Sequence, residues 1–297
     1  KELIAAQVAF TAKGCDDAWW ERQNTGCFPF ASCLIDDCLS RGIDHDRGGA
    51  RYHWAENSFV GVANLADALV AIDELVYQNN EMTLTEFYTI CKDNYAGNEP
   101  LRQRILNQLP KYGNDNDRAD MHAKAWTEFL CDTTESHSVG GHRYVPGFFC
   151  HINHAWLGKE TGATPDGRLH GEAFADGAGA AQGRDEAGPT ASVLSTTKWC
   201  HKRALGGLVH NLRFSREMFD SAEQRRAVQT VIETYLRRGG FEIQLNVLSA
   251  DTLRAAQANP EEYRDLVVRV AGYSDYFTTM MKEVQDEIIA RTEHADA

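Results

Sequence analysis

The stretch VVRVAGYSDYF, residues 267–277, decides the interpretation of this 297-residue chain. Its first residues form an apolar run typical of a short strand, and Gly272 lies between that run and an aromatic-rich turn. One explanation of the glycine is steric, since glycine alone adopts a positive φ at a strand end without cost. The other is chemical, since loss of a Cα hydrogen atom from glycine leaves a planar radical delocalised over the flanking amide and carbonyl groups.

Around this stretch, apolar residues that recur every three or four positions predict helices, and short β-branched or aromatic runs predict strands. We expect helices over 59–77, 83–93, 217–237, 251–258 and 276–291. Ser249 is the expected N-cap of the 251–258 helix, and Pro260 lies beyond its end. We expect strands over 50–54, 142–152, 206–214, 241–249 and 266–272. Short strands separated by long helices indicate an α/β architecture.

A Gly-, Ala- and Asp-rich stretch over 158–189 has turn residues and little periodicity, which is typical of a functional or a disordered loop. Within it, GAGAAQG (177–183) is only superficially similar to a dinucleotide-binding loop, because no strand precedes it and its glycine spacing differs. Asp176 would also face the pyrophosphate, so a structural role is expected. Asp166 and Arg168 suit a turn held by a charge-assisted pair.

The charge and cysteine content exclude several classes of protein. The chain has 30 Lys and Arg against 43 Asp and Glu, a net charge of −13, which argues against a nucleic-acid binder. No apolar stretch approaches the roughly 20 residues that span a bilayer. The eight cysteines are scattered without paired C-x-x-C units, which favours a reduced compartment over a disulfide scaffold. We expect a cytoplasmic protein that binds neither nucleic acid nor membrane.

A group of histidines and a cysteine has the composition of a metal site: His142, Cys150, His151 and His154. If the segment FFCHINH is extended, however, His151 and His154 point to opposite faces, and zinc needs four convergent ligands. We therefore expect no metal site, and these histidines should be buried or lie at a rim.

The residues also carry a family resemblance. RVAGYSDYF (269–277) resembles the glycyl-radical motif of the pyruvate formate-lyase superfamily. Similar blocks cover nearly the whole chain and point to the glycerol dehydratase-like branch: GGARYHW (48–54), NQLPKYGNDNDRAD (107–120), the Pro-Asp-Gly-Arg region over 161–196, and the strand–helix segment over 241–270. The resemblance implies that 1–189 is the C-terminal part of the barrel domain and 190–297 the glycine radical domain.

The implied fold is α/β: the C-terminal half of a ten-stranded glycyl-radical-enzyme barrel with its surrounding helices. The resemblance makes Gly272 the stored radical, installed by a separate S-adenosylmethionine-dependent iron–sulfur activating enzyme, with no cofactor bound by this chain. Gln244 and Asn246 share a face of one strand by the period of two, so they could hold the Gly272 loop. Ordinary ladder or core hydrogen bonds are the alternative. Tyr273 and Ser274 are expected to shape the loop.

Family members relay the radical through a cysteine in a Gly-Cys-x-Glu type loop, and this sequence lacks such a loop. The nearest segment is KGCDDAW (13–19), where Asp17 stands at the expected glutamate position. Cys15 is the candidate thiyl residue, and a non-catalytic thiol is the alternative. Cys27, Cys33 and Cys38 are expected to pack as small apolar side chains.

The chain also begins at Lys1, inside a helix-like pattern. We therefore expect the N-terminal half of the barrel to be missing, supplied by a longer protein or a partner chain, with a homodimer at full length.

The expected activity is radical elimination of a C–O or C–N bond, dehydratase-like, on a small polar substrate. A thiyl abstracts a C–H hydrogen atom, and a β leaving group is then lost. The alternatives are formate C-acetyltransferase or arylacetate decarboxylase activity, a non-catalytic radical-carrying subunit, and a radical-free homologue in which Gly272 is only a turn residue. No turnover is expected from the 297 residues alone.

Overall fold

The computed structural model describes residues 1–149, 151–270, 272–291 and 293–294. The chain divides into two compact units. The first unit comprises Lys1–Ser58, Glu128–Gly147 and Arg203–Gly207, and the second comprises Phe59–Thr127, Phe148–Lys202 and Leu208–Ala297. None of the helices in the described part of the chain combines the length and the apolar character that a bilayer span requires.

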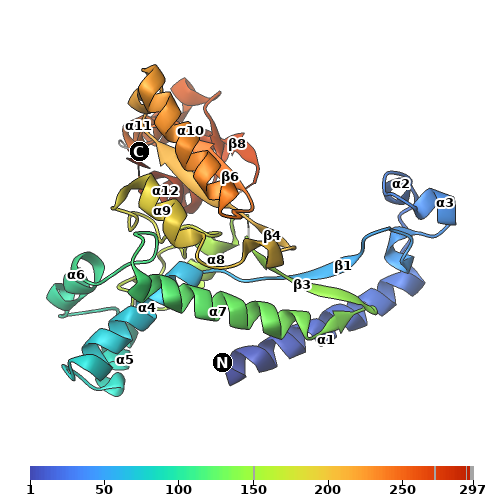
Figure 1. Cartoon of the computed structure of the whole chain (residues 1–297), viewed down its shortest axis with the longest axis horizontal. Helices are drawn as coiled ribbons and strands as arrows, with labels where there is room; N and C mark the ends of the chain where they lie inside the picture. The colour runs from blue at the N-terminus through green and yellow to red at the C-terminus, as the bar shows by residue number, and fades with distance from the viewer. Residues whose placement is uncertain (150, 271, 292, 295–297) are drawn as a thin grey trace. The chain divides into compact units, whose positions relative to one another are not determined.

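The first unit contains a long helix that lies against a small sheet (Figure 1). Its elements are α1 (Glu2–Thr25), α2 (Pro29–Cys33), α3 (Cys38–Arg41), the short 3₁₀ turn η1 (His45–Arg47), β1 (Trp54–Ser58), β2 (Ser138–Val139) and β3 (His142–Phe148). Strand β3 pairs in parallel with β1 from Arg143↔Trp54 to Gly147↔Ser58, and antiparallel with β2. The short β4 (Gly207–Leu208) also pairs with β3, and α7 (Asp117–Glu135) contributes residues to both units.

Packing in the first unit centres on Trp19 of α1, which is buried. Its ring lies 4.3 Å from that of His53 and 5.2 Å from that of His142. Gly140 has φ +58°, and a Cβ there would collide with the Trp19 indole, so the turn before β3 requires glycine. The Gly140 N–H donates to Asp16 Oδ1 at 2.7 Å, which ties that turn to α1.

The strand expected over 50–54 is wrong except at its last residue, since β1 begins at Trp54. Residues before it are held in a turn, because the Arg51 N–H donates to the Asp36 carbonyl and its guanidinium pairs with Asp37 at 2.8 Å. The cysteine expectation is also wrong in part: Cys38 is buried, whereas Cys27 and Cys33 are exposed.

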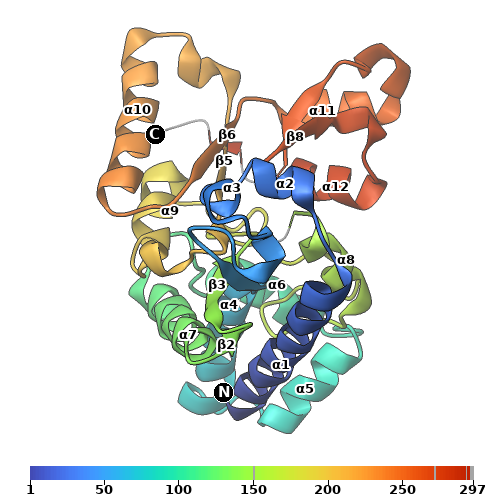
Figure 2. The ribbon, with the colours of Figure 1, turned by 90° about the vertical axis from the view of Figure 1, so that its right-hand side faces the viewer.

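In the second unit, strands β5 (His210–Phe214) and β6 (Ile243–Asn246) lie beside helix α10 (Ala222–Arg237) on one side (Figure 2). On their other side lie the hairpin of β7 (Val267–Arg269) and β8 (Ser274–Tyr276) and the helices α11 (Ala250–Ala258) and α12 (Lys282–Ala290). The sheet order is β6-β5-β9, all parallel, with registers His210↔Ile243 to Arg213↔Asn246 and Phe214↔His294. The elements are α4 (Val62–Ile72), the π-helical η2 (Asp73–Gln78), α5 (Leu84–Lys92), α6 (Glu99–Gln108), α8 (Asn153–Glu160), α9 (Gly188–Thr196), η3 (His201–Arg203), β5 (His210–Phe214), η4 (Arg216–Phe219), α10 (Ala222–Arg237), β6 (Ile243–Asn246), α11 (Ala250–Ala258), η5 (Pro260–Tyr263), β7 (Val267–Arg269), β8 (Ser274–Tyr276), η6 (Phe277–Thr279), α12 (Lys282–Ala290) and β9 (Glu293–His294).

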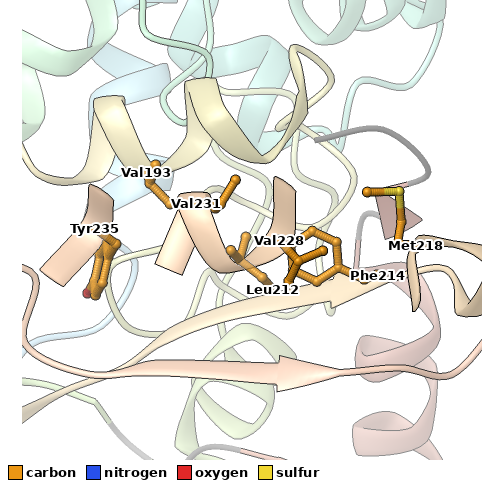
Figure 3. Packing of buried hydrophobic residues seen from close by; sticks show 7 residues of the cluster. All are labelled: Val193, Leu212, Phe214, Met218, Val228, Val231 and Tyr235. Atoms are coloured by element: carbon orange, nitrogen blue, oxygen red, sulfur yellow. The ribbon is translucent and has the colours of Figure 1, made fainter. Parts of the chain in front are cut away.

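Among the described residues of this unit, two groups of buried apolar side chains form cores. The first joins α9, β5, η4 and α10 (Figure 3) and consists of Val193, Leu212, Phe214, Met218, Val228, Val231 and Tyr235. The second joins α11, β7 and α12 and consists of Leu253, Ala256, Val268, Val270, Phe277, Val284 and Ile288. Because Val268 and Val270 belong to it, this second core anchors the chain that leads into Gly272.

Helix ends follow local hydrogen bonds. The Ser249 hydroxyl accepts the Thr252 N–H at 3.1 Å, which confirms the predicted N-cap of α11. Helix α10 begins at Ala222 rather than 217, because Ser221 and Gln224 form a capping box. The helix predicted over 59–77 is α4 continued by η2, and the helix predicted over 83–93 is α5. Of the helix predicted over 276–291, only Lys282–Ala290 is α-helical.

The expected strands are shorter than predicted, and one is wrong at its end. Strand β3 stops at Phe148 and α8 starts at Asn153, so the extended conformation assumed over 142–152 fails for its last residues. The α/β class is confirmed. The described strands form a four-stranded, a three-stranded and a two-stranded sheet, and none of these closes into a barrel.

Candidate functional site

Gly272 lies in the turn of a β-hairpin. Strands β7 and β8 pair antiparallel, with Val268 opposite Asp275 and Arg269 opposite Ser274. The Val270 N–H donates to the Tyr273 carbonyl at 2.9 Å, which closes the turn. Gly272 has φ +77°, as the steric explanation of this glycine requires.

The buried side chain of Gln244 contacts both sides of this turn. Its Oε1 accepts the Gly272 N–H at 2.8 Å, and its Nε2 donates to the Val270 carbonyl at 3.2 Å. Nε2 also donates to Asn211 Oδ1 on the neighbouring strand β5, which fixes the amide's orientation. A single side-chain amide therefore satisfies backbone groups on either side of the turn.

Asn246, two residues further along β6, makes a similar pair of contacts with the hairpin. Its Nδ2 donates to the Arg269 carbonyl at 2.9 Å, and its Oδ1 accepts the Arg269 N–H at 3.0 Å. The side chain thus pairs with β7 as a neighbouring strand would. The structure brings Gln244, Asn246 and Gly272 together, as the shared face of the strand predicts.

Tyr273 and Ser274 complete the hairpin. The Ser274 hydroxyl accepts from Arg269 Nη1 at 3.2 Å and is exposed. The Tyr273 ring is half-buried and lies 5.9 Å from the His151 ring. Burial raises the pKa of the Tyr273 phenol above its ordinary value. The Ser274 contact lies within the hairpin, whereas the Tyr273 ring contacts His151 outside it.

Gly272 itself is exposed in this chain. Apart from its chain neighbours, no described atom lies within 4 Å of the position that a Cβ would occupy. A Cβ at this position would therefore meet no described neighbouring atom, and the only steric reason for glycine that the described residues give is its positive φ.

An ion pair that the sequence did not predict also binds the turn. Arg291, just after α12, donates from Nη1 to the Val270 carbonyl at 3.0 Å. Its Nε and Nη2 donate to the two carboxylate oxygens of Glu287 at 3.0 and 2.9 Å. The i, i+4 spacing of a glutamate and an arginine was a visible signal, but nothing in the sequence showed that the pair is buried.

The charges of this pair are mutually stabilised. Burial opposes ionisation of Glu287, but the Arg291 guanidinium and His154 hold the pKa of this carboxyl well below its ordinary range. Burial likewise opposes the charged form of His154, whose Nε2 lies 3.5 Å from Glu287 Oε2, and that carboxylate raises the pKa of His154. The pKa of Arg291 is raised by the same carboxylate against the effect of burial.

His154 occupies this place because it lies in α8, not on a strand. The expected opposite orientation of His151 and His154 assumed an extended segment, and the structure has a helix from Asn153 instead. The His142 ring meets the rings of His53 and Trp19 in the first unit at interplanar angles of 51° and 69°, and Cys150 lies outside the described residues. Among the residues that the structure describes, no three His, Cys, Asp or Glu side chains are grouped to hold a metal ion.

The Asp166–Arg168 turn is held differently from the expected charge pair. The Arg168 guanidinium donates to the Thr164 hydroxyl and to main-chain carbonyls, including that of Glu172 at 2.6 Å. The Asp166 carboxylate instead accepts from Asn64 Nδ2 at 2.7 Å. The Arg168 N–H still donates to Asp166 Oδ1 at 3.5 Å, and the Thr164 hydroxyl bridges the two side chains, so the pair holds the turn without direct contact of its charged groups.

The GAGAAQG segment has the expected structural role. The Ala178 N–H donates to the Val209 carbonyl at 2.8 Å, so it is not available to a phosphate. Gly177 has φ +64°, and a Cβ there would collide with the same carbonyl. This close approach of two backbone segments explains the glycine.

Cys15 lies inside helix α1 of the first unit and is half-buried. The neighbouring Asp17 pairs with Lys13 at 2.9 Å, and Asp16 accepts from Gly140. A helix interior is not the loop position that the resemblance implies for a thiyl cysteine. The thiyl assignment of Cys15 therefore stays an untested prediction.

Known proteins match this arrangement over most of the chain. The model of a family described as pyruvate formate lyase-like matches residues 5–158, more than half of the chain, and a glycine radical model matches residues 174–278. "Probable dehydratase YbiW" of Escherichia coli (strain K12) is 37% identical over 274 residues, which cover 89% of this chain and 34% of the relative. The trans-4-hydroxy-L-proline dehydratase of Clostridioides difficile is 34% identical, covering 89% of this chain and 34% of the relative.

A solved structure agrees with these relatives. The glycerol-bound B12-independent glycerol dehydratase from Clostridium butyricum superposes with a TM-score of 0.92 at 34% identity, covering 98% of this chain and 38% of that one. The chain thus spans about a third of the length of the curated relatives that it matches. On these matches, the chain belongs to the pyruvate formate lyase-like family, and Gly272 lies within the segment that the glycine radical model matches.

Proposed function

We propose that this chain is the C-terminal, radical-bearing part of a glycyl radical enzyme, and that Gly272 is the residue that stores the radical. One observation carries the proposal: the Gly272 turn lies in the glycine radical segment, and buried side chains hold its N–H and the Val270 carbonyl. Hydrogen bonds of this kind orient the backbone on which an unpaired electron would be delocalised. Gln244, Asn246, Tyr273 and Ser274 are the residues that support the loop.

The chemistry follows from removal of one Cα hydrogen atom of Gly272 by a separate S-adenosylmethionine-dependent iron–sulfur activating enzyme. The stored radical then takes the hydrogen atom of a cysteine thiol elsewhere in the complete protein. The resulting thiyl takes a hydrogen atom from a substrate C–H bond, and the adjacent C–O or C–N bond breaks with loss of the leaving group. The product radical then takes the hydrogen atom back from the thiol, which restores the thiyl and, through it, the Gly272 radical. The dehydratase relatives favour a small polar substrate for this elimination.

The exposure of Gly272 supports an incomplete site. A carbon radical that is open to water and oxygen is short-lived, so a working site needs a cover over the turn. The relatives are about three times as long as this chain, and we propose that the corresponding part of the full protein covers Gly272 and supplies the thiyl. Residues 1–189 would then be the C-terminal half of the ten-stranded barrel domain, and 190–297 the glycine radical domain, in a cytoplasmic homodimer.

A stand-alone radical-carrying subunit is the competing proposal. It accounts for the glycine radical segment but not for residues 5–158, which match the pyruvate formate lyase-like model. That match favours part of a complete enzyme. Formate C-acetyltransferase and arylacetate decarboxylase activities would use the same Gly272 turn and differ in the substrate pocket.

The decisive experiment is activation, without oxygen, of the full-length protein that includes the cover proposed for Gly272, by a family activating enzyme, S-adenosylmethionine and a reductant. We expect an organic-radical doublet in the EPR spectrum and, after exposure to air, chain cleavage at Gly272 detected by mass spectrometry. Gly272→Ala should show neither. Gly239→Ala is the matched control, because Gly239 also has a positive φ, +92°, with open space around its Cβ position.

Gly239→Ala carries the same kind of backbone strain and should keep both signals. A folded protein without doublet or cleavage, or the same signals from Gly272→Ala, would show that Gly272 is only a turn residue. Turnover by these 297 residues alone would show instead that the thiyl lies within this chain, and would favour Cys15.

A further inference from the structure

We propose that Arg291 is a positioning residue for the Gly272 turn, and that buried Glu287 and His154 hold it in place. The inference rests on the proposed function, because it concerns how the same turn is fixed. The observation behind it is the hydrogen bond from Arg291 Nη1 to the Val270 carbonyl, two residues before Gly272.

The Val270 carbonyl is the point at which the turn is held from two sides. It accepts Gln244 Nε2 from β6 at 3.2 Å and Arg291 Nη1, beyond the end of α12, at 3.0 Å. A carbonyl oxygen has two lone pairs, so these donors use its full capacity. Because Gln244 also accepts the Gly272 N–H, a shift of Val270 would be transmitted to Gly272.

The guanidinium suits this task because its donors have a fixed planar geometry. Nε and Nη2 engage both oxygens of Glu287, which leaves Nη1 directed at Val270. The two side chains are 9% and 2% exposed, so water does not compete effectively for these bonds. A lysine retains the charge, but its single ammonium cannot reproduce the bidentate pair and reach Val270 in the same geometry.

The carboxylate oxygens of Glu287 also contact two residues other than Arg291. Gln182 Nε2 donates to its Oε1 at 3.0 Å, and His154 Nε2 lies 3.5 Å from its Oε2. The Asp176 carboxylate adds a second negative charge that acts on both His154 and Arg291. The turn is therefore tied, through Arg291 and Glu287, to helix α8 and to the loop that contains Gln182.

Arg213 offers a matched control. It is also a buried arginine of the second unit, and its Nη1 donates to the carbonyls of Ile288 and Ile289 in the last turn of α12. Among the described residues, the Arg213 guanidinium donates hydrogen bonds to α12 and none to the hairpin. Arg213→Lys thus reproduces the general loosening of the end of α12, but leaves the bond to Val270 in place.

The test is amide hydrogen–deuterium exchange of the chain as it stands, followed by mass spectrometry of peptides covering 266–277 and helix α10. Arg291→Lys should accelerate exchange of the hairpin peptide about tenfold or more relative to wild type, since a charge-assisted hydrogen bond is lost. Exchange in α10 should stay unchanged. Arg213→Lys should leave the hairpin peptide at its wild-type rate.

Glu287→Gln provides a second measurement, because it removes the charge partner of Arg291 without changing either group of the Arg291–Val270 hydrogen bond. Removing the carboxylate charge should lower the pKa of His154, followed by NMR, and should accelerate hairpin exchange by an intermediate amount. If Arg291→Lys fails to fold, the selective effect of Glu287→Gln on the hairpin decides the matter. Equal hairpin exchange in Arg291→Lys and Arg213→Lys, or an unchanged hairpin in a folded Glu287→Gln, overturns the proposal.

An EPR measurement after activation separates this inference from the proposed function. In Arg291→Lys we expect a weaker or faster-decaying glycyl doublet than in Arg213→Lys. An absent doublet in the wild-type protein would contradict the radical function. The exchange data would still decide whether Arg291 positions the turn.

Discussion

Strands β5 and β6 present two faces that are stabilised in different ways. Leu212 and Phe214 of β5, with Ile243 and Leu245 of β6, pack against the apolar core under α10. The alternate residues face the other way: Gln244 and Asn246 bond the hairpin, and Asn211 orients Gln244. On the same strands, the period of two separates an apolar face from a face of amides.

The two faces differ in how closely they constrain the position of the groups packed against them. Apolar contacts depend on buried area and volume and have little direction, so they hold α10 against the sheet without fixing individual backbone atoms. Hydrogen bonds weaken steeply with distance and angle, so the amide face holds particular groups, the Gly272 N–H and the Val270 carbonyl. A reactive backbone position needs the second kind of support.

The largest expected effect is on the apolar face. Phe214→Ala, at a fully buried position, should lower the free energy of unfolding by about 3–5 kcal/mol, measured by chemical denaturation. Leu236→Ala on α10 is the control, because that side chain is 50% exposed and should change stability by less than about 0.5 kcal/mol. A similar loss in both variants would contradict the assignment of the core.

The second-largest effect on stability is expected on the face of β5 and β6 that carries the amide side chains. Gln244→Leu keeps the volume but leaves the Gly272 N–H without its acceptor, which should cost about 1–3 kcal/mol locally. Hydrogen–deuterium exchange should accelerate in the 266–277 peptide more than in α10. Gln229→Leu is the control, since this exposed glutamine bonds only Glu233 among the contacts recorded for it. Uniform acceleration across both peptides would show that the face does not act selectively.

The smallest expected effect is the change in the free energy of unfolding with pH. It should have one sign for the buried histidines on the apolar face and the opposite sign for His154 near the hairpin. On the apolar side, burial lowers the pKa of His210 to about 3 and that of His201 to about 4. As pH falls below about 6.5, the unfolded chain binds protons that these buried rings do not, so stability decreases. From pH 6.5 to 5.5 we expect a loss of about 1 kcal/mol for each histidine.

His154 on the hairpin side should respond in the reverse direction. Its pKa is raised in the folded protein, so its contribution is fully present below its unfolded pKa and is lost as pH rises through the folded value. Denaturation curves from pH 5.5 to 8 for the wild type, His210→Gln and His154→Gln check both signs. His210→Gln should reduce the acid loss, and His154→Gln should reduce the alkaline loss. Unaltered pH profiles in both variants would contradict the two shifts.

Local signals in the sequence predicted the elements better than their ends. The Ser249 cap, the helix over 251–258 and the face shared by Gln244 and Asn246 were all visible, because each depends on a few neighbouring residues. The strand over 50–54 was wrong because the Arg51–Asp37 pair holds that segment in a turn. The partners of Arg168 were also missed, since they are carbonyls whose position depends on the folded loop.

The sequence by itself determined the family resemblance, the glycine in the turn and the strand whose amides face it. All of these are properties of residue type and spacing along one segment. Only the tertiary structure decided that the charges of Glu287 and Arg291 are buried and directed at Val270, and that His154 stands beside them. Burial and direction arise when α8, α12 and the hairpin come together. The energy of a buried charge depends on these neighbours, and the linear order of residues does not contain them.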